Sequence, residues 1–111
     1  MFRSIENRGF QIKFSNGYKI SVQFGPMNYC EKRSFSCKTE DSRAPLRPGN
    51  EHWESPNAEI AIFDPSENFL PIGNGDDVVG WVSPDKVGNI IGYVSSVKVP
   101  DPNFIRDFLN R

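Results

Sequence analysis

The fold of this chain is limited first by two runs of alternating apolar residues, 9–14 and 18–25, which flank the turn sequence Ser15-Asn16-Gly17. This pattern predicts an antiparallel hairpin with one buried face. A two-residue Asn-Gly loop would mix apolar and polar side chains on both faces of the hairpin. When the pairing register of the two strands is shifted by one residue, Ile12 lies opposite Ile20 on a wholly apolar face. We therefore expect a three-residue loop, a type I turn with Gly17 in the left-handed region at a G1 bulge. The opposite face then exposes two lysines, Lys13 and Lys19.

Two helices are predicted near the C-terminal end of the chain, each from the same start signal. Ser83-Pro84 and Asp101-Pro102 both join an N-cap residue to a proline that suits the first helical position. Apolar residues spaced three and four apart follow each signal. We therefore expect one helix that ends near Lys98, before Pro100, and a second helix over 102–110.

A single α+β domain is predicted for the whole chain, residues 1–111. Residues 58–64 and 78–82 have the apolar and β-branched content of strands and are bounded by turn residues. Together these elements make a small antiparallel β-sheet, formed by the N-terminal hairpin plus two further strands, with two C-terminal helices. Residues 26–57 are polar, charged and punctuated by proline and glycine, so we expect a long loop inside the domain.

Composition narrows the classes of partner and site. The net charge of −1 gives no electrostatic reason to expect DNA, RNA or an anionic membrane as partner. No apolar run approaches the roughly 20 residues that span a bilayer, and the N-terminus lacks a signal-peptide pattern, so a cytoplasmic protein is predicted. Cys30 and Cys37 are expected to be free thiols there, with a disulfide as the alternative. Their spacing to the single histidine, His52, fits no standard zinc site, so neither a metal nor a cofactor is predicted.

Binding is better supported than catalysis. The sequence contains no G-x-S-x-G, P-loop or H-E-x-x-H motif, and an enzyme is not expected. The predicted polar surfaces instead carry groups that suit a nucleotide-like ligand: an indole ring for a base, amide and phenol groups for hydrogen bonds, and guanidinium groups for phosphate. These candidate residues are Trp81, Asn89, Tyr93, Arg106 and Arg111. The plainer alternative makes Trp81 a core residue, Asn89 a solvated helix residue and Arg106 a surface charge.

Two segments resemble small proteins of bacteriophages and prophages: NGYKISVQFGPMNYC at 16–30 and GDDVVGWVSPDKVGNIIGYVS at 75–95. In length and layout the chain is similar to the Thoeris anti-defence sponges. That resemblance implies the capture, without cleavage, of a cyclic ADP-ribose isomer made by bacterial immune enzymes. It also implies a ligand held at subunit interfaces by an aromatic residue, an asparagine and an arginine near the C-terminus, for which the candidates are Trp81, Asn89 and Arg106.

The leading hypothesis is therefore a non-catalytic binder of a nucleotide second messenger, either a cyclic ADP-ribose isomer or a cyclic nucleotide. A homo-oligomer built on dimers is expected, because the apolar face of 102–110 is large for so short a chain. Two alternatives stay open. One is a protein–protein interaction module or phage structural accessory that uses loop 26–57 as its contact surface, and the other is a small hydrolase of such messengers.

Overall fold

The computed structural model, which describes residues 1–4, 9–24 and 55–111, contains a five-stranded antiparallel sheet and two helices. The strands lie side by side in sequence order, and the helices follow them in the chain. The elements are β1 (Phe2–Ser4), β2 (Gly9–Lys13), β3 (Lys19–Gln23), β4 (Ala58–Phe63), β5 (Val78–Val82), α2 (Pro84–Ser96) and α3 (Pro102–Leu109). The predicted α+β class, a small antiparallel sheet with C-terminal helices, is confirmed.

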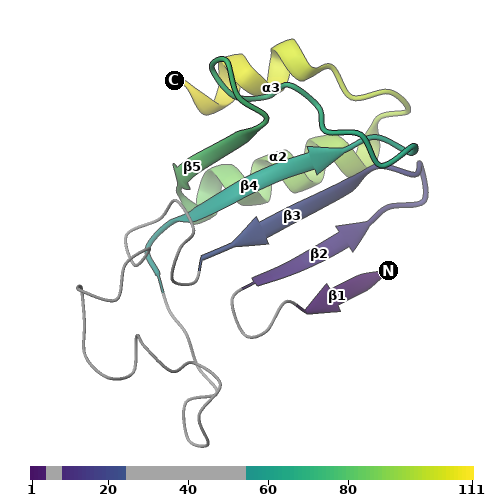
Figure 1. Cartoon of the computed structure of the whole chain (residues 1–111), viewed down its shortest axis with the longest axis horizontal. Coiled ribbons are helices and arrows are strands. Elements are labelled where there is room, and N and C mark those ends of the chain that lie inside the picture. Colours follow the sequence, from purple (N-terminus) through teal and green to yellow (C-terminus); the bar gives the residue numbers. More distant parts are fainter. Residues whose placement is uncertain (5–8, 25–54) are drawn as a thin grey trace, which may run out of the picture.

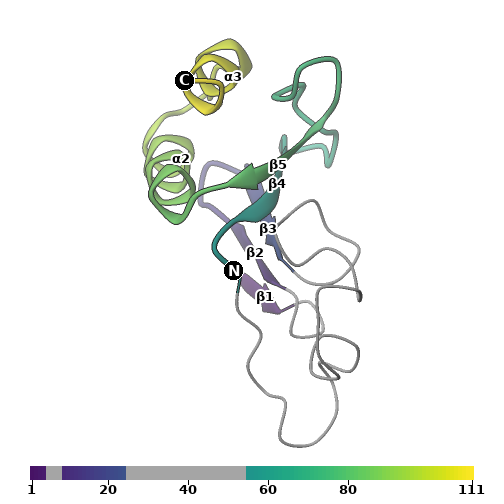
Figure 2. The same cartoon turned by 90° about the vertical axis from the view of Figure 1, so that its left-hand side faces the viewer.

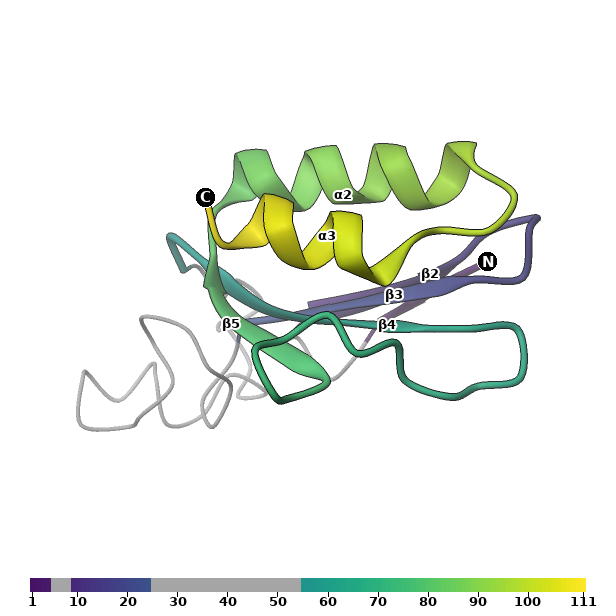
Figure 3. The same cartoon turned by 90° about the horizontal axis from the view of Figure 1, so that it is seen from above.

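Both helices cover the same face of the sheet and run antiparallel to one another (Figures 1–3). The core lies between them and the central strands, where side chains of β3, β4 and both helices are fully buried. The largest of these are Ile20, Ile60, Ile62, Ile90, Val94 and Ile105. This arrangement follows from the sequence pattern, because alternate residues of a strand and every third or fourth residue of a helix share one face.

The hairpin has the register that its buried face requires. Ile12 pairs with Ile20 across β2 and β3, and Ile20 is completely buried while Ile12 packs against the core. The amide of Gly17 donates to the carbonyl of Phe14 at 2.9 Å, and Gly17 has a φ of +92°. The predicted three-residue loop with a left-handed glycine is therefore confirmed.

Gly17→Ala is expected to lower the free energy of unfolding by about 1–2 kcal/mol, because a side chain in the left-handed region is strained. The added Cβ would also lie 3.0 Å from the ring carbons of Pro65. Urea unfolding of the parent and the variant measures this loss. Gly75→Ala is the matched control, since Gly75 has a φ of +79° with open space where its Cβ would be and reports the backbone cost alone. Equal losses in the two variants would mean that the contact with Pro65 costs nothing.

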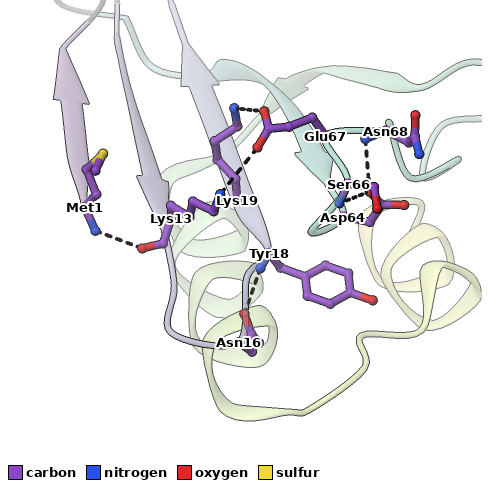
Figure 4. A network of polar contacts seen from close by, with 9 residues as sticks. All are labelled: Met1, Lys13, Asn16, Tyr18, Lys19, Asp64, Ser66, Glu67 and Asn68. Atoms are coloured by element: carbon purple, nitrogen blue, oxygen red, sulfur yellow. Dashed lines mark hydrogen bonds and ion pairs between the residues drawn. The ribbon is translucent and has the colours of Figure 1, made fainter.

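Two features of the sheet differ from the sequence prediction. The sheet has a further strand, β1, whose Phe2 pairs with Ile12 and is 80% exposed. Lys19, predicted to be exposed, keeps only 17% of its side-chain area accessible. Its ammonium group lies 2.7 Å from Glu67 (Figure 4). The same group lies 4.6 Å from the centre of the Phe63 ring. Lys13 is exposed as expected.

Glu67 joins the hairpin to the turn after β4. Its carboxylate lies 2.7 Å from the ammonium of Lys19 and 3.6 Å from that of Lys13 (Figure 4). The hydrogen bond from Lys19 is the main reason why the pKa of Glu67 is lowered. Its contribution to stability is therefore complete above the ordinary glutamate pKa and is lost as the pH falls through the lowered value of the folded state.

The two helices begin as predicted and end within two residues of the predicted positions. The Ser83 hydroxyl accepts from the amide of Lys86, and the Asp101 carboxylate accepts from the amide of Asn103, so both N-caps are confirmed. Helix α2 ends at Ser96 rather than at Lys98. Within the described ranges, no helix is long and apolar enough to cross a membrane.

Helix α3 packs on its own chain. Ile105 and Leu109 are buried in the common core, and the ammonium of Lys86 donates to the carbonyls of Leu109 and Arg111 at 3.2 and 3.0 Å. The apolar face from which the homo-oligomer was predicted is thus covered mainly by its own chain, and the homo-oligomer stays a prediction. Only Phe104, at 44% exposure, remains substantially accessible on that face.

The turn of the hairpin also holds the end of α2. The side-chain amide of Asn16 donates to the carbonyls of Val94 and Val97, at 2.7 and 2.8 Å, and its oxygen accepts from the amide of Tyr18. Carbonyls at a helix end lack partners within the helix, and they are often satisfied by a glycine-based cap. Here Val97, the C-cap residue, is extended, and Asn16 supplies the missing donors from the other side of the fold.

Candidate ligand-binding site

Trp81 is the most unusual of the predicted binding residues. It lies near the end of β5, the last strand in the order of the sheet, and 54% of its surface is exposed. Its φ is +54°, one of two positive values among the non-glycine residues in the described part of the chain. A bulky residue in this region costs about 1–2 kcal/mol. The alternative of a core position for Trp81 is excluded by its exposure.

A β-bulge produces this conformation. Ala58 pairs with Val82 and Ile60 pairs with Val79, so the one residue between them on β4 faces two on β5, Gly80 and Trp81. Such a bulge re-aims the side chain of the bulged strand. The left-handed position of bulges is commonly glycine, yet here the glycine precedes that position and tryptophan occupies it. The sequence signal for the bulge is the Gly-Trp pair within an otherwise regular strand.

Arg106 does not extend freely from α3. Its Nε donates to the carbonyl of Gly73 at 3.3 Å, its Nη2 donates to the carbonyl of Pro71, and its Nη1 donates to the Asn103 side chain at 2.7 Å. The guanidinium thus holds the segment that leads into β5. This role was missed from the sequence, because backbone carbonyls 33 and 35 residues away leave no sequence pattern.

The segment held by Arg106 borders a polar cavity of about 570 Å³ that is open to solvent. The amide of Gly73 donates to the carbonyl of Asp76 at 2.8 Å, and a Cβ on Gly73 would lie only 2.5 Å from that oxygen, so the turn requires glycine. The residues that line the cavity are Pro71, Gly73, Asn74, Gly75, Asp76, Asp77 and Arg106. Carboxylate and amide oxygens accept hydrogen bonds from hydroxyl groups, whereas the two acidic residues oppose an anion.

The other three predicted residues occupy separate places. Asn89 is exposed on α2. The hydroxyl of Tyr93 accepts from the amide of Asp101 at 3.0 Å, and its ring lies 4.5 Å from that of Phe104, so Tyr93 joins the two helices. The guanidinium of Arg111 lies 5.3 Å from the centre of the Phe108 ring.

The structure therefore does not gather the five candidates into one cavity of a single chain. Arg106 lines the polar cavity and none of the other four does. A second cavity, which is apolar and lies between the sheet and the first half of α2, is lined by none of the five. In the described part of the chain, no cluster of three or more His, Cys, Asp or Glu residues could hold a metal ion. Cys30, Cys37 and His52 lie outside the described residues.

Comparison with known proteins assigns no family and no function to this chain. The chain matches no protein-family model, and neither the curated proteins nor the solved structures contain a significant match.

Proposed function

We propose that this chain is a non-catalytic cytoplasmic binding protein that captures a nucleotide-derived second messenger, a cyclic ADP-ribose isomer or a cyclic nucleotide, and so blocks bacterial anti-phage signalling. The proposal combines the resemblance of residues 16–30 and 75–95 to phage sponges with one structural observation. That observation is Trp81, a large aromatic residue that is exposed and backbone-strained at the same time.

Both properties of Trp81 are unfavourable for folding. An indole ring with more than half of its surface in water contributes only part of the burial energy that makes tryptophan stabilising, and the left-handed backbone adds a cost. Strain of this kind clusters at active sites, ligand clamps and switch regions. An exposed ring suits a nucleobase, because stacking of a base on an aromatic side chain contributes about 1–3 kcal/mol.

The proposal includes a homo-oligomer, and the separation of the candidate residues supports it. Trp81, Asn89 and Arg106 come from β5, α2 and α3 and do not line a common cavity of one chain. A ligand that contacts all three groups needs a second subunit, so we place the binding site between subunits. In this arrangement Arg106 also fixes the 71–77 segment through its bonds to Pro71 and Gly73.

Trp81→Gly tests the role of the indole ring. Glycine removes the left-handed strain but also the buried part of the indole ring, so the free energy of unfolding is expected to change by less than about 2 kcal/mol. Retention of the messenger should nevertheless fall about tenfold, the lower part of the range for a lost stacking contact. Both quantities can be measured on the same preparation, by urea unfolding and by equilibrium dialysis against a candidate cyclic nucleotide.

Trp81→Phe is the matched control, because it keeps an aromatic ring and the strain. It should retain ligand more tightly than Trp81→Gly. Unchanged retention in Trp81→Gly would contradict the role of the ring. A loss of more than about 2 kcal/mol of stability in that variant would instead make Trp81 a packing residue.

A further inference from the structure

An apolar cavity of about 290 Å³ lies between the sheet and the first half of α2. Strand β2 contributes Phe10 to its wall, β3 contributes Val22, and Phe24 follows directly after β3. Helix α2 contributes Val87, Gly88 and Ile91. Neither Trp81 nor Arg106 takes part in this cavity. It is therefore separate from the residues on which the proposed function rests.

The described wall of this cavity is uncharged and mainly hydrocarbon. Two phenylalanine rings face it from the sheet side, and its polar groups come from Ser55 and Asn57. The Ser55 hydroxyl donates to the carbonyl of Asn57 at 2.7 Å, so this end is already ordered within the chain. Sites for small molecules have this composition: a mostly apolar and aromatic wall with a small number of polar groups that fix orientation.

The volume sets the size of the occupant. A cavity of about 150 Å³ lined by apolar side chains stays dry and binds benzene. The present cavity is about twice as large, so a molecule of two fused rings fits it. The described part of the wall offers no partner for a charge, and an unpaired charge in an apolar site is strongly disfavoured, so this part of the wall suits a neutral ligand.

We propose that this cavity is a binding site for a neutral two-ring aromatic molecule, held between the sheet phenylalanines and the first half of α2. The polar end at Ser55 and Asn57 orients a ring N–H or a ring nitrogen. Two kinds of compound share this chemistry, a free indole-like molecule and the base of a neutral nucleoside.

Gly88 offers a direct way to close the site. It lies in the cavity wall on α2, and an added Cβ would have no atom within 4 Å apart from its chain neighbours and the backbone of its own helix. Gly88→Leu therefore adds a side chain that starts from open space at the cavity, and it also removes a helix-weakening glycine. Gly92→Leu is the matched control, because Gly92 lies one turn further along the same helix with equally open space but is not in the wall. Ala58→Leu fills the cavity from the sheet side.

Indole and adenosine are the two probes, each titrated to millimolar concentration into the parent and the three variants. Binding is followed by the amide resonances of Gly88 and Ile91 and by the rise in melting temperature. We expect indole to bind the parent and Gly92→Leu equally, and to bind Gly88→Leu and Ala58→Leu at least tenfold more weakly. If adenosine also binds the parent and is weakened by Gly88→Leu, the occupant is the base of a nucleoside. If only indole binds in this way, the occupant is a free indole-like molecule.

Absence of binding by both probes to the parent would overturn the proposal. Equal binding by the parent, Gly88→Leu and Ala58→Leu would also overturn it, because the probe would then lie elsewhere. Neither result bears on messenger capture, which is measured with Trp81→Gly.

Discussion

Replacing Asn16 with aspartate is expected to lower the free energy of unfolding by about 3 kcal/mol at pH 7. The amide of Asn16 donates both of its hydrogens to the end of α2, to the carbonyls of Val94 and Val97. A carboxylate can only accept hydrogen bonds, so both carbonyls lose their donor. Its negative charge also lies at the negative end of the helix dipole, which adds to the loss.

Asn16→Ala separates the lost hydrogen bonds from the added charge. It should cost about 2 kcal/mol, the sum expected for two partly buried hydrogen bonds, with a fall in melting temperature of about 8–10 °C. Asn89→Ala is the control for the same chemical change on an exposed face of α2, and it should change stability by less than about 0.5 kcal/mol. Equal stability of Asn16→Ala and Asn89→Ala would show that the turn does not hold the helix.

The charge component should depend on pH. The helix carbonyls disfavour the carboxylate, so the pKa of the introduced aspartate is raised in the folded variant. A group with a raised folded pKa stabilises the fold when protonated, and this stabilisation is lost as the pH rises through that folded value. The difference between Asn16→Asp and Asn16→Ala should therefore be largest near neutral pH and disappear below the ordinary aspartate pKa. A difference that is constant with pH would contradict this explanation.

Replacing Arg106 with alanine is expected to lower the free energy of unfolding by about 2 kcal/mol. The guanidinium joins α3 to the segment before β5 through Gly73 and Pro71, and hydrogen bonds to a charged donor are stronger than neutral ones. We take a value near the lower end of the range for such bonds, because Arg106 is half-exposed and solvent weakens its contacts. Amide hydrogen exchange of residues 73–77 should accelerate in the same variant, since this segment loses its anchor.

Two controls show whether geometry or charge is responsible. Arg106→Lys keeps the charge but not the forked donors, so it should restore less than half of the lost stability. Arg111→Ala removes an exposed guanidinium that lies 5.3 Å from the centre of the Phe108 ring, and it should cost less than about 0.5 kcal/mol. Full rescue by lysine would show that only the positive charge matters at this position.

The elements that local chemistry determines could be predicted from the sequence. The hairpin register followed from the requirement that Ile12 and Ile20 share a buried face, and the pairing confirms it. Both helix starts followed from serine or aspartate before proline. The strand β1 was missed, because its sequence FRS is only three residues long and its phenylalanine is exposed. Three residues are too few to show the alternation of apolar and polar residues that marks a strand. Its pairing with β2 supplies the evidence that the sequence lacks.

Contacts between distant segments could not be predicted. Asn16 was interpreted as a turn residue, and its bonds to a helix end 78 and 81 residues away depend on how α2 packs. Arg106 was predicted to bind phosphate, and its hydrogen bonds to the carbonyls of Pro71 and Gly73 were not predicted. The exposure of Trp81 depends on a bulge whose position is set by pairing with β4. In each case the residue type was informative, but its partner was decided by tertiary structure.

The most direct test of the proposed function is to determine the chemical state of a captured ligand. The purified protein is incubated with cyclic ADP-ribose isomers and cyclic nucleotides, separated from excess ligand, denatured by heat and analysed for released small molecules by mass spectrometry. The account predicts that one of these compounds is released intact, in a fixed ratio to protein, and in a much lower ratio from Trp81→Gly. Release of a cleaved product would identify a hydrolase, and release of nothing would favour an interaction module. Either result would contradict non-catalytic capture.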